Sequence, residues 1–293
     1  SDSSKKNNNA DEKPKPFLSR QRNIGLNKCH TSAHTRSRRK CFPFSRCCQR
    51  ASRHADKLCH LPLDAVGDPL MQLLIINPNT SKGVTARIKQ AADAAAQPGD
   101  VFTTLYPTFG PELIVTEADA ETASRAVRET VKAYDAPCDG IVLASFGNTG
   151  AEAVRALRPD IPVIGIATAA FSIAGAVGGN FGIVTFSSAL VPALQAKAEE
   201  AGLGPRLLGA LAVDTSDFGD PGTVQDRYRE ELSQLCKQMH DSGATCVVMG
   251  GGPLAGMAAK LAPTSPVPLI DGTKGAINIL RTLVGDRKVE GAS

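Results

Sequence analysis

The chain carries the same pattern twice, and this internal repeat constrains its fold more than any single motif. The first copy is the run IVLASFGNTG at 141–150, and the second is CVVMGGGP at 246–253. The two copies lie 106 residues apart, so Ser145 aligns with Gly251. A second pair of apolar runs, 74–76 and 182–184, repeats with an offset of 108. A duplicated α/β lobe of this kind can place two equivalent strand-to-helix loops face to face across one cleft.

Composition divides the chain near Met71. Residues 1–70 hold 15 Lys or Arg and 6 Asp or Glu, a formal charge of +9, whereas residues 71–293 hold 18 and 23, a charge of −5. The net charge of +4 therefore belongs to the front segment and gives no reason to expect nucleic-acid binding by the rest. Residues 13–55 contain no acidic residue, and hydrophobic periodicity is absent, so residues 1–70 are predicted to be a disordered basic extension.

Three interpretations of residues 1–70 stay open. They form an unstructured extension (or sequence translated upstream of a start at Met71), an organellar transit peptide, or a metal site. The metal site would be built from Cys and His residues whose spacing matches no standard zinc pattern. These residues are Cys29, His30, His34, Cys41, Cys47, Cys48, His54, Cys59 and His60. We therefore expect no metal.

Compartment and membrane association follow from residue usage. The chain has no run of about 18 apolar residues, the length that a membrane span requires. The three cysteines after residue 70, Cys138, Cys236 and Cys246, show no disulfide-framework spacing, which favours a reducing compartment. We expect a cytoplasmic protein without membrane contact, or an organellar one if residues 1–70 are a transit peptide.

From Met71 onward, short apolar runs alternate with helical patterns, which predicts parallel sheets covered by helices on both faces. The expected strands are 73–76, 101–105, 140–144, 163–167, 181–185, 206–213, 245–249 and 267–270. The expected helices are 82–96, 116–133, 152–157, 169–175, 190–201, 224–242, 254–261 and 274–284. We therefore expect an α/β fold of two pseudo-symmetric, doubly wound, Rossmann-like lobes. Residues 71–166 with 272–293 would form lobe 1, residues 167–271 would form lobe 2, and the active site would lie between them.

Four loops follow the expected strands at 77–81, 145–150, 185–188 and 250–253, and all are rich in Ser, Thr, Asn and Gly. Ligands bind beyond the carboxyl ends of parallel strands, where backbone N–H groups at helix starts favour anions. Helix caps and tight turns alone would explain any one of these loops, but four in duplicate favour a ligand site. The predicted contacts are Asn77, Asn79, Phe146, Gly147, Asn148, Thr149, Thr185, Ser187, Gly250, Gly252 and Pro253.

Four motifs resemble the aspartate/glutamate/hydantoin racemase superfamily, on its hydantoin and allantoin racemase branch. They are IINPNTS at 75–81, ASFGNTG at 144–150, PVIGI at 162–166 and PLIDG at 268–272. They occur in the family's order and span about 71–285. The resemblance implies a cofactor-independent racemase, an amino acid or cyclic ureide as substrate, and a homo-oligomer. One cysteine thiolate would remove the proton from the stereocentre, and a second thiol on the opposite face would return one.

The sequence departs from the family at both catalytic positions. Ser145 stands at the first cysteine position and Gly251 at the second, while Asn148 stands where the branch tends to have Asp. Cys246 does not compensate, because it lies five residues before Gly251 within the expected strand. A serine hydroxyl is a poor base at neutral pH unless a neighbour takes its proton.

Other bases could replace the missing thiols, and the candidates are Ser145, Asp271 and Tyr106. His240 is expected on an exposed helix face. We therefore predict α-proton transfer with impaired racemisation, and two alternatives stay open: a one-sided lyase or decarboxylase, and a non-catalytic protein that binds a small carboxylate. A nucleotide-binding protein is disfavoured, because 250–253 lacks the G-x-G-x-x-G spacing and no P-loop lysine follows.

Overall fold

The computed structural model describes residues 70–214 and 219–290. The predictions for the front segment, which are disorder, a transit peptide or a Cys/His metal site, fall on residues outside the described part of the chain. In the part that is described, no helix is both long and apolar enough to cross a membrane.

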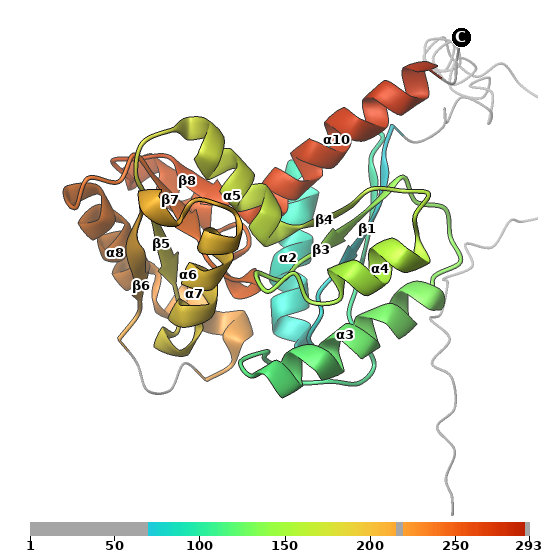
Figure 1. The fold of residues 1–293 in the computed structure, drawn as a ribbon, viewed down its shortest axis with the longest axis horizontal. Coiled ribbons are helices and arrows are strands. Elements are labelled where there is room, and N and C mark those ends of the chain that lie inside the picture. Colours follow the sequence, from blue (N-terminus) through green and yellow to red (C-terminus); the bar gives the residue numbers. More distant parts are fainter. Residues whose placement is uncertain (1–69, 215–218, 291–293) are drawn as a thin grey trace, which may run out of the picture. The chain divides into compact units, whose positions relative to one another are not determined.

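The chain forms two four-stranded sheets in which every paired strand is parallel. The first sheet has the order β2-β1-β3-β4 and the second has the order β6-β5-β7-β8 (Figure 1). The strands are β1 (Gln72–Ile76), β2 (Val101–Leu105), β3 (Gly140–Leu143), β4 (Val163–Gly165), β5 (Phe181–Thr185), β6 (Leu207–Ala212), β7 (Cys246–Met249) and β8 (Leu269–Asp271). The predicted fold class is confirmed. We call the first sheet with its helices lobe 1 and the second lobe 2.

Strand pairing reproduces the repeat in register. Leu73 pairs with Gly140 in lobe 1, and Phe181 pairs with Cys246 in lobe 2, which gives offsets of 108 and 106. The same correspondence holds where each central strand ends: Ala144 N donates to Ile76 O at 2.8 Å, and Gly250 N donates to Val184 O at 2.8 Å. The loops after β3 and β7, which carry positions 145 and 251, are therefore structural equivalents.

Helices cover both sheets. They are α2 (Lys82–Ala95), α3 (Glu117–Lys132), α4 (Ala151–Leu157), α5 (Ile166–Val177), α6 (Val191–Glu200), α7 (Val224–Arg227), α8 (Arg229–Asp241), α9 (Met257–Leu261) and α10 (Gly272–Glu290). Short 3-10 turns are η2 (Ser188–Leu190), η3 (Gly204–Arg206), η4 (Pro221–Thr223), η5 (Gly252–Leu254) and η6 (Ala262–Thr264). Helix α3 shows why such a segment starts where it does: Thr116 and Asp119 form a reciprocal capping box, which satisfies two backbone N–H groups.

Several predicted boundaries were wrong: the helices expected over 169–175 and 274–284 are longer, and the strand expected over 267–270 is shifted to Leu269–Asp271. Three further differences have a local backbone reason. The strand expected over 163–167 ends at Gly165, because α5 begins at Ile166; a buried strand and a buried helix have the same apolar pattern. The helix expected over 224–242 is interrupted at Tyr228, whose φ of −119° is not helical. The helix expected over 254–261 starts only at Met257, after Gly256 with a φ of +83°.

The core joins the two sheets. Its largest cluster includes Ile75 and Val142 from lobe 1, and Phe181 and Val248 from lobe 2, all fully buried. Helix α10 follows the last strand of lobe 2 yet packs against α2 and β3 of lobe 1, and against α5 (Figure 1). Burial of one large apolar side chain stabilises a fold by about 1.5–3 kcal/mol, so this shared core holds the two lobes together.

Candidate functional site

A cavity of about 670 Å³ lies where the central strands of both sheets end. The loops after β1, β3, β5 and β7 all contribute to its wall, through Asn79, Ser145, Phe186 and Gly251 among others. This is the place where open parallel sheets bind ligands. Nine of the site residues predicted from the sequence line this cavity: Asn79, Ser145, Phe146, Gly147, Asn148, Thr149, Gly251, Gly252 and Pro253.

The loop after β3 presents two hydroxyl groups to the cavity. Ser145 Oγ lies 3.1 Å from Thr149 Oγ1 and accepts a hydrogen bond from the Gly147 N–H at 3.2 Å. Thr149 is buried and Ser145 is half-buried. A pair of neutral hydroxyls can orient a substrate and relay a proton, but neither ionises near neutral pH without a neighbouring base.

Asn148 gives this loop its turn. With a φ of 51°, it is the only non-glycine residue in the described part of the chain that has a positive φ. Asparagine tolerates this conformation better than most residues. Its Oδ1 accepts from Thr168 Oγ1 at 3.4 Å and lies 2.1 Å from where a Cβ at Gly165 would stand. The glycine at the end of β4 therefore makes room for the Asn148 side chain.

The equivalent position in lobe 2 favours glycine. Gly251 has a φ of 130° and a ψ of 144°, a region that essentially only glycine occupies. A Cβ built there would lie 3.0 Å from Phe186 Cε1. The backbone conformation disfavours a side chain and the aromatic ring crowds one, and glycine itself supplies no acid or base to this face of the cavity.

None of the described cysteines lines the cavity. Burial raises the pKa of the Cys236 thiol to about 12. Burial also raises the pKa of Cys246, and that of Cys138, whose Sγ lies 3.9 Å from Arg158 Nη1. These thiols are protonated at neutral pH. A protonated thiol is a poor proton acceptor, because the thiolate is the reactive form.

Four residues predicted to contact a ligand, Asn77, Thr185, Ser187 and Gly250, are buried or tightly packed and do not line this cavity. Asn77 Nδ2 donates to Asn79 Oδ1 at 2.8 Å and to Thr85 Oγ1 at 3.0 Å, so it orients Asn79, which does line the cavity. Thr185 Oγ1 donates to Gly250 O at 2.7 Å. The scaffold therefore uses these polar groups to hold the loops.

The two proposed substitute bases other than Ser145 also lie outside the wall. The Asp271 carboxylate accepts hydrogen bonds from the backbone N–H groups of Gly256, Thr273 and Lys274, so it caps α10. Desolvation raises its pKa against the opposing effect of those N–H groups. Tyr106 is exposed at the end of β2, outside the wall.

Sequence reasoning missed much of the wall. One part comes from the segment before α3 and from α3 itself: Leu113, Ile114, Val115, Thr116, Glu117, Ala120, Glu121 and Ser124. Another part comes from η2 and α6: Leu190, Ala193, Leu194 and Lys197. Periodicity predicted these helices, but it does not say which side of a helix faces a cavity that is formed by distant strands.

Charge in the wall is mostly negative. Glu117, Glu121 and Glu152 line the cavity, and Lys197 is the one cation in the wall that the structure describes. Lys197 Nζ is already paired with Glu200 at 2.6 Å. Lys197 and Asn148 also line an adjoining cavity of about 430 Å³ between α5 and α6. Over residues 70–214 and 219–290, no group of three or more His, Cys, Asp or Glu side chains is placed to hold a metal ion.

Comparison with known proteins decides the family. The model of the Asp/Glu/hydantoin racemase family matches residues 73–280. This chain belongs to that family. The hydantoin racemase of Paenarthrobacter aurescens is 30% identical over 219 residues, which cover 73% of this chain and 91% of that protein.

Two solved allantoin racemases are similar in structure. Allantoin racemase from Klebsiella pneumoniae is 30% identical, with a TM-score of 0.66, covering 73% of this chain and 87% of that one. Allantoin racemase from Pseudomonas fluorescens is 28% identical, with a TM-score of 0.65, covering 73% and 91%. The match on the hydantoin and allantoin racemase branch confirms the resemblance seen in the sequence motifs.

Proposed function

We propose that this family member acts on a neutral cyclic ureide of the hydantoin type by α-proton transfer, with inversion slowed by the missing second base. The observation that carries the proposal is the pairing of Ser145 and Gly251. Both line one cavity at equivalent strand ends, and one of them has no side chain. The similarity of the chain to hydantoin and allantoin racemases supports the substrate class.

The charges of the wall favour a ureide over a dicarboxylic amino acid. The wall holds three carboxylates, from Glu117, Glu121 and Glu152, and one ammonium group, from Lys197, which Glu200 already pairs. Two unit charges 4 Å apart interact by about 1 kcal/mol in water and about 4 kcal/mol near a protein surface. These glutamates are exposed, so salt reduces the effect. Even so, aspartate or glutamate would enter against net repulsion, whereas a neutral ring would not.

The apolar part of the wall suits a ring substituent. Leu113 and Ile114 from lobe 1, and Phe186, Leu190 and Leu194 from lobe 2, contribute to it. Each buried methylene of a ligand contributes roughly 0.8 kcal/mol. We therefore expect hydantoins that carry an alkyl or aryl group at the stereocentre to bind more tightly than allantoin, whose substituent is polar.

We assign the proton-transfer side to the loop after β3. The C–H bond at the stereocentre breaks, its electron pair moves onto the adjacent carbonyl as an enolate, and the proton passes to water held by Ser145 and Thr149. A wall carboxylate (Glu117, Glu121 or Glu152) accepts it in turn. Hydrogen-bond donors in the loop stabilise the enolate oxygen, which is the largest effect in comparable proton abstractions. The proton then returns from the same side.

A second candidate function is a one-sided lyase or decarboxylase, in which a bond other than C–H breaks at the stereocentre. The contact between Phe186 and Gly251 favours it, because an apolar ring covers the face from which a second proton would come. A non-catalytic binding protein stays as the alternative if no turnover is found. Cytoplasmic location and homo-oligomeric assembly stay predictions.

The test is α-proton exchange in D₂O, measured together with optical rotation. Single enantiomers of 5-benzylhydantoin, allantoin, aspartate and glutamate would be incubated with the protein. We expect exchange of 5-benzylhydantoin faster than loss of rotation, and no exchange of the two amino acids. Equal rates of exchange and rotation loss would show a second base and contradict the one-sided mechanism. Binding without any exchange would support the non-catalytic alternative.

A further inference from the structure

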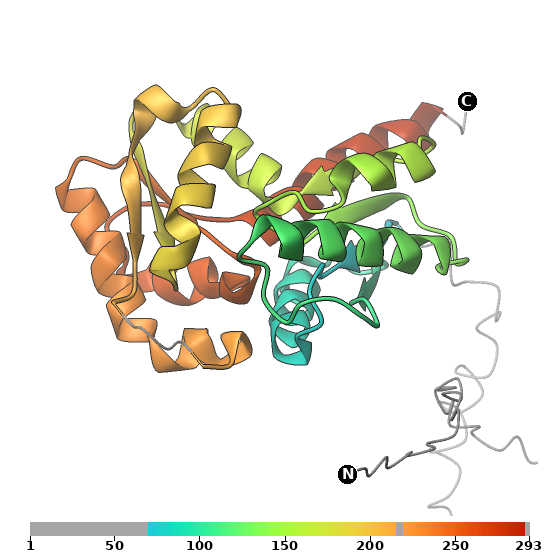
Figure 2. The ribbon, with the colours of Figure 1, turned by 60° about the horizontal axis from the view of Figure 1, so that its bottom comes forward.

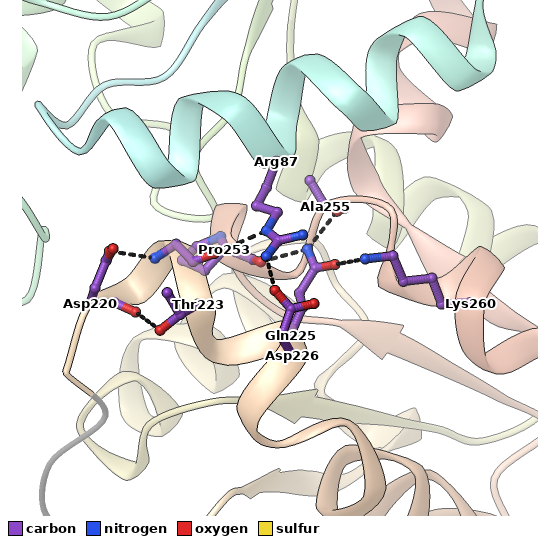
Figure 3. Close-up of polar contacts among 9 residues, drawn as sticks. Arg87, Asp220, Thr223, Gln225, Asp226, Pro253, Ala255 and Lys260 are labelled. Atoms are coloured by element: carbon purple, nitrogen blue, oxygen red, sulfur yellow. Dashed lines mark hydrogen bonds and ion pairs between the residues drawn. The ribbon is translucent and has the colours of Figure 1, made fainter.

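A polar cluster at the back of the cavity wall connects the two lobes (Figure 3). The loop after β7 contributes Gly251, Gly252 and Pro253 to the lobe 2 part of the wall. Behind it stands Gln225 on α7, only 2% exposed. Gln225 does not line the cavity; it holds the loop that does.

All the hydrogen-bonding groups of the Gln225 amide are used. Its Nε2 donates to Pro253 O at 2.8 Å and to Ala255 O at 2.7 Å, and its Oε1 accepts from Lys260 Nζ at 2.9 Å. An ammonium group can only donate, so the amide must face Lys260 with its oxygen. The two N–H groups are then fixed on the two carbonyls. Burial of this amide is costly unless all of these bonds form.

Lobe 1 holds the segment that carries Gln225. Arg87 on α2 donates from Nε to Gly222 O at 2.9 Å and forms an ion pair with Asp226, next to Gln225. The backbones are also in contact: a Cβ at Gly222 would lie 2.5 Å from Gly83 Cα. Figure 2 shows α2, in cyan, beside this segment of lobe 2, in orange.

We propose that Gln225 is a positioning residue that fixes the lobe 2 wall of the cavity, and that Arg87 makes this positioning depend on contact between the lobes. The proposal rests on the proposed function only for its effect on the ligand. Helix α2 begins at Lys82, with Ser81 as its N-cap, directly after the loop that carries Asn79. One helix thus follows directly on a wall residue of lobe 1 and, through Arg87 and Gln225, positions the loop after β7 in the wall of lobe 2.

The first experiment measures the loop without any substrate. Amide hydrogen exchange reports on Leu254 and Ala255, whose N–H groups bond to Gly251 O and Gly252 O at 3.0 Å each. In Gln225→Met these two amides should exchange faster, while the β7 amides stay as in the wild type. Gln225→Glu retains the Lys260 contact but lacks both donors, so it should behave like Gln225→Met. Gln238→Met, on an exposed face of α8, is the matched control and should change nothing.

The second experiment measures the ligand. The rate of α-proton exchange of 5-benzylhydantoin should fall in Gln225→Met, by up to about 10²-fold if the wall moves by 1 Å, and less in Arg87→Gln, which leaves the Gln225 bonds intact. Unchanged exchange at Leu254 and Ala255 in the folded variants would overturn the proposal, as would faster exchange spread evenly over all strands. If Gln225→Met does not fold, Gln225→Glu and Arg87→Gln decide. If no ureide binds the wild type, the proposed function fails, and hydrogen exchange still decides the role of Gln225.

Discussion

The ring of Phe186 occupies the space that a side chain at Gly251 would need, because its Cε1 lies 3.0 Å from where a Cβ would stand. The two residues come from the ends of β5 and β7, neighbouring strands of one sheet. Position 251 therefore differs from a site that merely carries glycine by chance. The backbone and the neighbouring strand are both adapted to a glycine.

Gly251→Cys should destabilise the protein and should not restore racemisation, even together with Ser145→Cys. Backbone strain at such a position costs about 1–3 kcal/mol, and the Phe186 contact adds to it. Denaturant unfolding and optical rotation would measure the two effects. Gly202→Cys is the control for strain alone, because Gly202 has a φ of +73° and nothing within 4 Å of its Cβ position. Full racemisation by the double variant would contradict the closed-face interpretation.

Gly165→Ala should displace the loop that carries Ser145. The added Cβ would stand 2.1 Å from Asn148 Oδ1, so Asn148 must leave its place, at a cost of about 1–3 kcal/mol. We expect lower thermal stability and a large loss of α-proton exchange. Gly285→Ala, with nothing within 4 Å, is the control and should slightly stabilise α10. Normal exchange in Gly165→Ala would show that Asn148 does not shape the site.

The carboxyl group of Asp271 should make the protein less stable as pH rises above its unfolded pKa. Burial raises its folded pKa above 3.8, so between these two values the folded state binds more protons than the unfolded state, and the free energy of unfolding falls with pH. Unfolding of the wild type and of Asp271→Asn, measured from pH 3 to pH 7, should show this falling component only in the wild type. Identical pH slopes would contradict the raised pKa.

Alkylation of the cysteines should leave α-proton exchange intact, because none of the described thiols lines the cavity. Iodoacetamide should modify half-buried Cys138 before buried Cys236 and Cys246, as mass spectrometry of peptides would show. Loss of exchange in step with Cys138 modification would point to a thiol mechanism after all.

The sequence predicted the fold well because the repeat and the apolar runs are local signals. The loops after β3 and β7 fall at the expected strand ends, and Ser145 and Gly251 line one cavity as equivalents. The other features depend on distant parts of the chain. The ring of Phe186 contacts Gly251 because their strands, β5 and β7, pair in the folded sheet. In the sequence, Gln225 looks like an ordinary helix residue, and only the fold brings it to Pro253. Asn77 and Thr185 look like ligand contacts, but their hydrogen bonds are internal.

Helix α10 has a consequence for the order in which the protein is made. It follows β8, the last strand of lobe 2, yet it packs on α2 and β3 of lobe 1, and Gly272 at its start has no room for a Cβ because Ile166 O would lie 2.4 Å away. Domains generally fold as units while the ribosome synthesises the chain. Here the strands of lobe 1 are synthesised first, but the surface that α10 covers stays open until the residues after 271 have been made. Lobe 1, whose four strands are made first, is therefore completed only after all the strands of lobe 2 have been made.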